Sequence, residues 1–436
     1  MEYIPNIIFL LLLIGAGAWF AKSAGRIRRN ILLGRDVEVD GDSSVRLRTM
    51  MKVAFGQSKM VVRPVAGFLH IIVYVGFVLI NIEVAEIVID GLLGTHRIFA
   101  APLGGLYNAA IGFFEVLGLG VLISCAIFLY RRNVMKIDRF HNPEMEGWPF
   151  KDANYILIIE IVLMSALLIM NAAEANFEHR VAGPFLLSQF IAPLFAGMDQ
   201  GTLHLIERSC WWGHIVGILL FLNYLPFSKH FHIILAFPNT YYSKLRPKGD
   251  LNNLEAVKKE VELMMDPNAD PYATPAEPVG EPQRFGAKDV QDLSWIQLMN
   301  AYTCTECGRC SSNCPANITG KKLSPRKIMM DTRDRLEEVG RNIDANNGTF
   351  QDDGKSLLGD FISVEELWAC TSCNACTEAC PVNIDPMSII IDMRRYLVME
   401  ESKIPTELAP VFTNIENNGA PWQFAQADRA NWITEE

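Results

Sequence analysis

The sequence predicts an all-α protein in two parts, a bundle of five transmembrane helices followed by a helical soluble domain. Half of the 436 residues are apolar, and they concentrate before about residue 237, whereas charged residues crowd the remainder. Eight cysteines form two regular groups in this second half, and the segment between the groups has helical periodicity with few strand signals. These features divide the chain into a bundle (1–240), a linker (241–283), a cysteine-rich domain (284–398) and a tail (399–436).

The first apolar segment, 4–20, is long enough to span a membrane together with its flanking positions. A secretory signal peptide is the alternative, but it would need a basic start. The charge that precedes the segment is Glu2, and the nearest basic residues come after the segment. We therefore expect an uncleaved anchor whose N-terminus lies outside the cell.

Four more apolar segments are each long enough to cross a hydrocarbon core about 30 Å thick. They are 64–88, 105–130, 154–173 and 209–236. The connections before the second and fourth segments hold ten and five Lys or Arg residues, whereas the other two connections hold one and two. Because basic connections stay in the cytoplasm, the cysteine-rich domain is expected to be cytoplasmic.

The segments outside these spans have weaker patterns. The outer connection, 174–208, contains an apolar stretch too short to span, for which we expect an interfacial helix. Residues 251–265 read as a charged amphipathic helix, and 266–283 are rich in Pro, Ala and acids, as in a linker. The tail is polar and carries two candidate partner-docking side chains, Trp422 and Trp432.

The two cysteine groups have the same spacing, C-x2-C-x2-C-x3-C-P, which is the bacterial pattern for 4Fe-4S clusters. In that pattern the fourth cysteine of each group binds the other cluster. Zinc is a weaker alternative, because two identical four-cysteine sets with a trailing proline suit it poorly. Disulfides are disfavoured on the cytoplasmic side. The predicted ligands are Cys304, Cys307, Cys310 and Cys380 for one cluster, and Cys370, Cys373, Cys376 and Cys314 for the other.

Four histidines lie within or at the ends of apolar segments, where an imidazole is costly unless it has a function. Two imidazoles at one depth could bind haem b, and we expect this pair to be His70 and His232. His230 is the reserve ligand, because positions two apart on a helix face different ways. The alternative is a set of hydrogen-bonded packing histidines.

His214 is expected near the opposite membrane surface from His232. A second haem there would need another ligand, and no predicted span supplies one. His179 and His204 of the outer connection are the remaining candidates, although loop histidines are usually solvated. We therefore expect one haem b, or two if His214 finds a partner.

Several acids also fall within the predicted spans, and they could exchange protons with a quinone or simply hydrogen-bond across helices. They are Glu83, Glu86, Glu115 and Glu160. Cys125 and Cys210 stand alone in apolar surroundings, as packing residues do. The net charge is −10, and no basic patch interleaved with aromatic residues occurs near the cysteines, so a nucleic acid is not expected as a partner.

Two stretches carry a resemblance to known families. RPVAGFLHIIVYVGF together with WWGHIVGILLFLNYLPFSKHFHIILAFPNTYY resembles the five-span cytochrome b domain of the respiratory nitrate reductase gamma subunit and of the E subunit of heterodisulfide reductase. YTCTECGRCSSNCPANITGKKLSPRKI together with CTSCNACTEACPVNIDP resembles the helical ferredoxin module of the C subunit of heterodisulfide reductase. The resemblance implies a fused membrane iron-sulfur protein of a bacterial or archaeal cytoplasmic membrane.

Two departures from these families shape the expected partners. The gamma-subunit pattern has a further ligand ten positions after His70, where this chain has Ile80. The chain also lacks the adjacent cysteine pair of the CCG-type catalytic domain. The resemblance therefore implies a hetero-oligomeric complex with a separate cytoplasmic redox subunit, either a CCG-type protein or an electron-transfer flavoprotein.

The function that these features favour is that of a subunit, rather than a complete enzyme, of a quinone-dependent oxidoreductase. Electrons would pass between the cytoplasmic partner, the two clusters, haem b and the (mena)quinone pool. One alternative is a membrane anchor without haem that holds a ferredoxin relay for a larger assembly. Another is a subunit of an ion-translocating complex, with the intramembrane acids as the proton route.

Overall fold

The computed structural model describes residues 3–39, 41–247, 249–267, 284–423 and 425–434. Within these ranges the chain is helical, with two isolated β-bridges and no strand. Five helices are long and apolar enough to cross a membrane, as the sequence predicts. They are α1 (Ile4–Ile31), α3 (Pro64–Leu93), α5 (Gly105–Asn133), α6 (Trp148–Glu174) and α7 (Gln200–Tyr224).

The ends of these helices follow from local sequence signals. A proline at the first turn starts α3, and Gly94, with φ at 74°, ends it in the left-handed conformation that glycine accepts. The α7 helix starts at Asp199, whose carboxylate accepts a hydrogen bond from the Thr202 backbone N–H.

The fifth span begins and ends earlier than predicted. Pro226 interrupts the hydrogen-bond ladder after α7, and the chain continues through short 3-10 turns at Leu225–Phe227 and Lys229–Phe231 into α8 (His232–Tyr241). The candidate ligands therefore lie beyond the span and not on one continuous helix, with His230 in the second 3-10 turn and His232 at the start of α8. The expected interfacial helix of the outer connection was also wrong, because that segment forms two 3-10 turns, Ser188–Phe190 and Ala192–Phe195.

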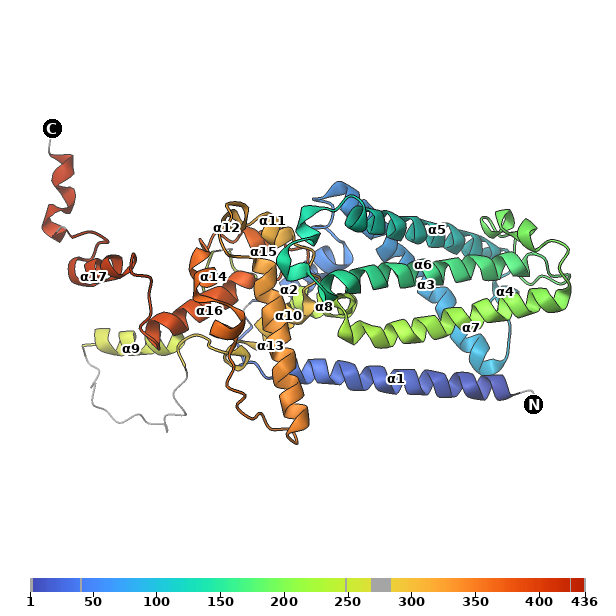
Figure 1. Ribbon diagram of the computed structural model, residues 1–436, viewed down its shortest axis with the longest axis horizontal. Coiled ribbons are helices and arrows are strands. Elements are labelled where there is room, and N and C mark those ends of the chain that lie inside the picture. Colours follow the sequence, from blue (N-terminus) through green and yellow to red (C-terminus); the bar gives the residue numbers. More distant parts are fainter. Residues whose placement is uncertain (1–2, 40, 248, 268–283, 424, 435–436) are drawn as a thin grey trace.

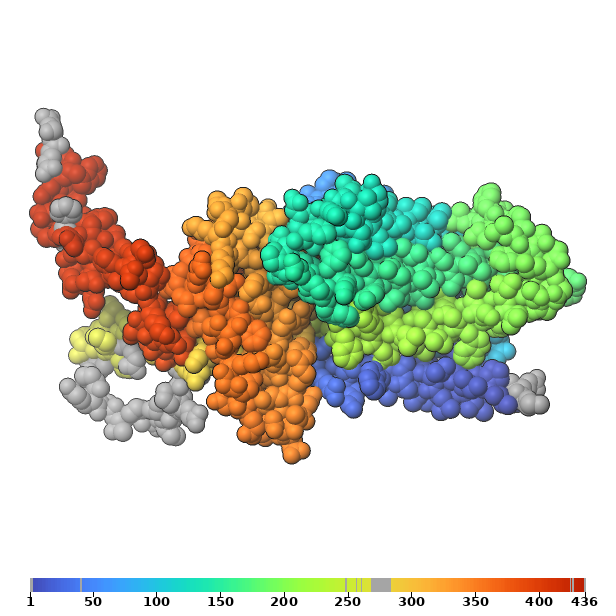
Figure 2. Space-filling view, viewed as in Figure 1, coloured from blue at the N-terminus to red at the C-terminus, as the bar shows by residue number. Residues whose placement is uncertain are grey.

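The soluble domain packs directly on one end of the bundle (Figures 1 and 2). We call this the domain end, and the opposite end the far end. One hydrophobic core runs through the junction, because Ile31 of α1 and Phe231 belong to the same buried cluster as Leu298 of the soluble domain. At the far end, Phe9 of α1 covers Gly91, where an added Cβ would lie 2.7 Å from the ring of Phe9.

The soluble domain is built from short helices around two longer ones. They are α10 (Trp295–Thr303), α11 (Arg309–Ser312), α12 (Pro315–Ile318), α13 (Pro325–Ala345), α14 (Val364–Ala369), α15 (Ala375–Ala379) and α16 (Pro386–Met399). Capping boxes start α10 at Ser294 and α14 at Ser363, each satisfying backbone N–H groups that the helix leaves unpaired.

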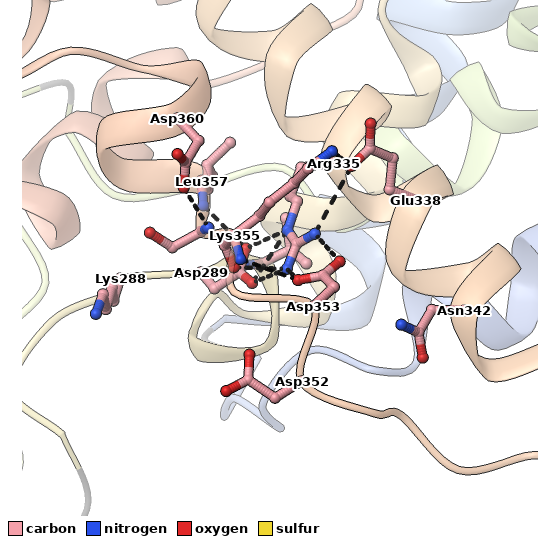
Figure 3. A network of polar contacts seen from close by, with 12 residues as sticks. Lys288, Asp289, Arg335, Glu338, Asn342, Asp352, Asp353, Lys355, Leu357 and Asp360 are labelled. Carbon is pink, nitrogen blue, oxygen red and sulfur yellow. Dashed lines mark hydrogen bonds and ion pairs between the residues drawn. The ribbon is translucent and has the colours of Figure 1, made fainter. Parts of the chain in front are cut away.

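Arg335 of α13 ties the segment between the two cysteine groups to the start of the domain (Figure 3). Its side chain is fully buried. Its Nη2 lies 2.7 Å from Oδ2 of Asp289, its Nη1 lies 2.6 Å from Oδ2 of Asp353, and it also donates to the carbonyl oxygen of Lys355 at 2.8 Å. Because a bidentate guanidinium pair has a defined geometry, this contact holds the intervening loop in one place.

Four further α-helices complete the described set: α2 (Ser43–Met50), α4 (Ala100–Leu103), α9 (Glu255–Met265) and α17 (Ala409–Asn418). The α2 helix packs on α8 at the junction, whereas α9 and α17 lie at the outer edge of the soluble domain (Figure 1). The α9 helix matches the predicted amphipathic helix, whereas most of the predicted linker, 268–283, lies outside the described residues. The tail projects beyond the soluble domain in Figure 1, and Trp422 and Trp432 are 46% and 74% exposed.

Candidate metal centres

The two cysteine loops have the same backbone shape. In the first loop, Glu306 and Gly308 have φ of 55° and 70°, and in the second loop Ser372 and Asn374, at the same positions, have φ of 54° and 59°. Alternating left-handed residues curl a chain tightly and turn successive N–H groups to one side. A Cβ added at Gly308 would lie 2.6 Å from Nη1 of Arg326, so this side chain would have to move to admit a larger residue.

The fold brings the cysteines together in the crossed pattern that the spacing predicts. One pocket is lined by three cysteines of the first group and the last cysteine of the second group. We call this the first cysteine set: Cys304, Cys307, Cys310 and Cys380. In the second set, Cys370 interacts electrostatically with Cys314 and Cys373, and Cys376 interacts with Cys370. Their role as ligands to two clusters remains a prediction.

Burial and hydrogen bonding shape the chemistry of these thiols. Burial raises the pKa of Cys304 and Cys376 to about 12, so these groups become thiolates only when a cation replaces the proton. Backbone N–H groups point at sulfur in both sets, from Ser372 to Cys370 Sγ at 3.4 Å and from Ile384 to Cys380 Sγ at 3.3 Å. In the described part of the chain, no three His, Cys, Asp or Glu side chains are placed to share a single metal ion.

Comparison with known proteins agrees with this geometry. Residues 303–384 match the 4Fe-4S dicluster domain family. The chain carries a 4Fe-4S dicluster domain. It is 30% identical over 434 residues to the probable iron-sulfur-binding oxidoreductase FadF of Bacillus subtilis, and this match covers 93% of this chain and 57% of that protein. No solved structure shows significant similarity to the chain.

Two further relatives indicate the same class of protein. The chain is 26% identical over 465 residues to the EtfAB:quinone oxidoreductase of Syntrophomonas wolfei, covering 98% of this chain and 59% of that protein. It is also 30% identical over 120 residues to the C subunit of the ferredoxin/F(420)H(2)-dependent CoB-CoM heterodisulfide reductase of Methanosarcina acetivorans, covering 27% of this chain and 60% of the relative. The chain thus spans less than two thirds of these relatives, which are iron-sulfur oxidoreductases or their subunits.

Three of the predicted histidines meet at the domain end. The rings of His230 and His232 are 5.3 Å apart and nearly perpendicular. His70, near the start of α3, interacts electrostatically with His232, and His230 interacts with both. His230 lies in a 3-10 turn and His232 begins α8, so the two residues do not share one continuous helix, and the choice between them as the ligand that pairs with His70 stays a prediction.

The hydrogen bonds of these histidines leave nitrogen atoms available. Nδ1 of His70 is buried and has no hydrogen-bond partner. Nδ1 of His232 lies 3.1 Å from the carbonyl oxygen of Lys229, so this nitrogen carries the proton and Nε2 keeps its lone pair. Burial lowers the pKa of His230 and His232, which keeps both imidazoles neutral. These residues therefore fit the needs of axial haem ligation.

His214 lies near the middle of α7, not near a membrane surface as predicted. It is buried, and its Nδ1 lies 3.0 Å from the carbonyl oxygen of Leu163. His204 instead packs its ring against Phe177 at 4.3 Å, and His179 is exposed. The structure brings neither of these two histidines to His214.

Three of the four predicted acids lie in one buried network at the far end. Glu83, Glu86 and Glu115 are each at most 4% exposed. Glu86 accepts hydrogen bonds from the Tyr107 hydroxyl at 2.7 Å and the Phe99 backbone N–H at 2.9 Å. Glu160 lies apart from this network and interacts with Cys125.

Arg97, which the sequence reasoning counted only toward topology, is the centre of this network. Its Nη2 lies 2.7 Å from Oε2 of Glu174 and 2.8 Å from Oδ1 of Asn171, and its backbone N–H donates to Asp90 at 2.7 Å. Nothing in the local sequence distinguishes this arginine from a solvated loop residue. Its position between two apolar segments was the available signal.

Glu306 is a second residue that the sequence reasoning missed. It stands between Cys304 and Cys307, is 3% exposed, and pairs with Lys229 and with Arg333, the latter at 2.7 Å. Lys229 also lies next to His230 in the chain. One buried ion pair therefore connects the first cysteine loop to the histidine turn.

Proposed function

We propose that the chain is an electron-transfer subunit of a membrane-bound quinone oxidoreductase. It would pass electrons between a soluble redox partner, two 4Fe-4S clusters, haem b and a (mena)quinone pool. The relatives indicate an iron-sulfur electron-transfer oxidoreductase. The observation that supports the finer proposal is the link between the first cysteine set and the histidines at one end of the bundle, because Arg309 interacts both with Cys307 and Cys380 and with His70.

The residues of the chain would bind, orient and bury the redox groups. The cysteine sets would hold the clusters, and His70 with His232 or His230 would hold the haem. When bound, these groups supply one-electron chemistry. The chain supplies thiolates supported by backbone N–H groups, neutral imidazoles, and a helix bundle that keeps water away from the histidines.

The partner and the orientation belong to the same proposal. A flavoprotein partner is supported by the similarity to an EtfAB:quinone oxidoreductase, and a CCG-type partner by the similarity to heterodisulfide reductase subunits. We place the soluble domain in the cytoplasm of a bacterium or archaeon, with the N-terminus outside, because of the distribution of Lys and Arg.

A second candidate function, proton translocation, has one specific observation behind it. Oε1 of Glu83 is buried without a hydrogen bond, and the nearest cation is Nη1 of Arg97 at 3.8 Å. A buried carboxyl oxygen without a hydrogen bond is costly, and the neighbouring Glu86 and Glu115 are both hydrogen-bonded. If this function is correct, Glu83→Gln abolishes proton release while electron transfer continues; loss of both together argues for a purely structural glutamate.

The proposed function is tested by a reduced-minus-oxidised visible spectrum of the purified protein, with haem and iron quantified per chain. We expect one haem b in the native protein and none in His70→Ala, with eight irons in both. Two haems in the native protein would give His214 a ligand role. A native protein with full iron and no haem contradicts the relay and favours the anchor function.

A further inference from the structure

The first cysteine set is attached to the bundle by contacts from three separate segments. Lys59 Nζ donates to the carbonyl oxygen of Cys380 at 3.2 Å. Asn239 Nδ2 of α8 donates to the carbonyl oxygen of Val382 at 2.8 Å, two residues further along. Lys229 forms its buried ion pair with Glu306 in the same set's loop. The first set is thus fixed against the domain end.

Arg309 lies between this set and the histidines. It is 6% exposed, lines the pocket of the first set, and interacts electrostatically with Cys307 and Cys380. Its Nη1 donates to the carbonyl oxygen of Lys59 at 3.0 Å. The same guanidinium interacts with His70. One buried cation therefore faces both candidate centres.

The second cysteine set has a different environment. Cys373 is the exposed cysteine among the eight. The described hydrogen bonds around Cys370 stay within the soluble domain: Arg394 of α16 donates to its carbonyl oxygen and to the Ser372 hydroxyl, the latter at 3.3 Å. In Figure 1, α14, which leads into Cys370, lies farther from the bundle than α11 of the first loop. Cys310 interacts with Cys376, so the two sets adjoin each other.

We propose that the two sets act in a fixed order, with the second set exchanging electrons with the soluble partner and the first set exchanging them with the haem at His70. Arg309 is the positioning residue for the exchange between the first cysteine set and the haem at His70. The proposal rests on the proposed function. Each transfer moves one electron and no atom, and the partner and the quinone are the terminal donor and acceptor, in either direction.

The order is tested by measuring magnetic relaxation in full-length protein in lipid nanodiscs. Cys373→Ala keeps the first cluster and Cys307→Ala keeps the second, so each reduced cluster gives an isolated paramagnetic signal. We expect a gadolinium-chelating lipid to speed relaxation of the first cluster alone. A soluble dysprosium chelate should act mainly on the second. The reverse pattern, or equal effects, overturns the order.

The role of Arg309 is tested against a matched arginine of the other set. We expect Arg309→Gln to lower the midpoint potential of the first cluster, because a nearby positive charge is removed, and to change the ferric haem signal. Arg309→Lys should restore both. Arg394→Gln should lower the potential of the second cluster and leave the haem signal unchanged. If Arg394→Gln changes the haem signal and Arg309→Gln does not, the assignment is wrong.

These two tests separate the inference from the proposed function. If the purified protein contains no haem, the proposed function is wrong. The relaxation measurements still report which cluster lies near the lipid surface. If a cysteine variant does not assemble, the arginine pair still decides the order. If the protein contains haem but Arg309→Gln and Arg394→Gln shift the potential of the same cluster, the proposed function stands and the proposed order of the clusters is wrong.

Discussion

The two ends of the bundle both bury polar side chains, but they differ in how the hydrogen-bonding groups are satisfied. At the far end the groups satisfy one another: Arg97 reaches Glu174 and Asn171, and Asp90 accepts from the Thr95 hydroxyl and two backbone N–H groups. Buried polar groups saturated in this way fix the positions of helices.

At the domain end, by contrast, the protein leaves groups open. Nδ1 of His70 has no partner, His232 uses one nitrogen for a carbonyl oxygen, and buried thiols line a pocket. Buried polar atoms without a hydrogen-bond partner destabilise the fold unless a bound ligand or metal pairs with them. Burial of a polar side chain therefore does not by itself mark function. Glu83 is the far-end residue that breaks the pattern.

The largest expected effect is on the far end. Arg97→Ala removes the cation that pairs with the fully buried Glu174, and breaking such a pair costs about 3–5 kcal/mol. We expect a large fall in the midpoint of thermal unfolding in detergent. Arg180→Ala, an exposed arginine of the outer connection, should change stability by less than about 0.5 kcal/mol. If Arg97→Ala and Arg180→Ala have equal midpoints of thermal unfolding, the network does not stabilise the fold.

The next prediction contrasts two buried histidines. His70→Gln should lose haem, because the open nitrogen at the domain end is the proposed ligand, whereas His214→Gln should keep it. The measurement is the pyridine haemochrome content per chain. Haem loss in His214→Gln alone would move the site to the middle of the bundle.

The third prediction concerns the crossed cysteine sets. Cys314→Ala should remove the cluster of the second set, although Cys314 belongs to the first sequence motif, because the structure groups it with Cys370. Electron paramagnetic resonance of the reduced protein distinguishes the two clusters. Selective loss of the first cluster would contradict the crossed pattern.

A smaller effect is expected at the junction of the two parts. Burial raises the pKa of Glu144, but the Ser324 hydroxyl and Arg326 outweigh burial and lower it below 4.5. A lowered pKa means that the carboxylate stabilises the fold above about pH 4.5 and stops doing so as the pH falls through the folded pKa. The difference in unfolding midpoint between native protein and Glu144→Gln should therefore be largest near neutral pH and shrink in acid. A difference that stays constant with pH would argue against the ion pair.

The smallest expected effect on the fold comes from the tail. Truncation after about residue 400 should leave iron and haem unchanged, because the tail projects beyond the other helices of the soluble domain. If Trp422 and Trp432 dock a partner, the same truncation releases that partner protein during purification. A purified complex with the same set of proteins as the native one would assign the tail another role.

Features that depend on short-range spacing could be read directly from the chain. Apolar length predicted five spans, and the described part of the chain has five helices of that kind. The repeated cysteine spacing predicted the dicluster domain, which the family match confirms. It also predicted the grouping of Cys304, Cys307 and Cys310 with Cys380, which line one pocket, whereas their role as cluster ligands stays a prediction.

Contacts between distant segments, in contrast, emerged only from the folded molecule. Pro226 gave a local signal for a break in the helix, but it did not show where α7 ends. The proximity of His70 to His230 and His232 depends on how the following turn packs. Arg97 and Glu306 gained their partners from residues 77 positions away in each case, Glu174 and Lys229. Sequence patterns report periodicity and composition, whereas an ion pair depends on which side chains the fold brings within a few ångströms of each other.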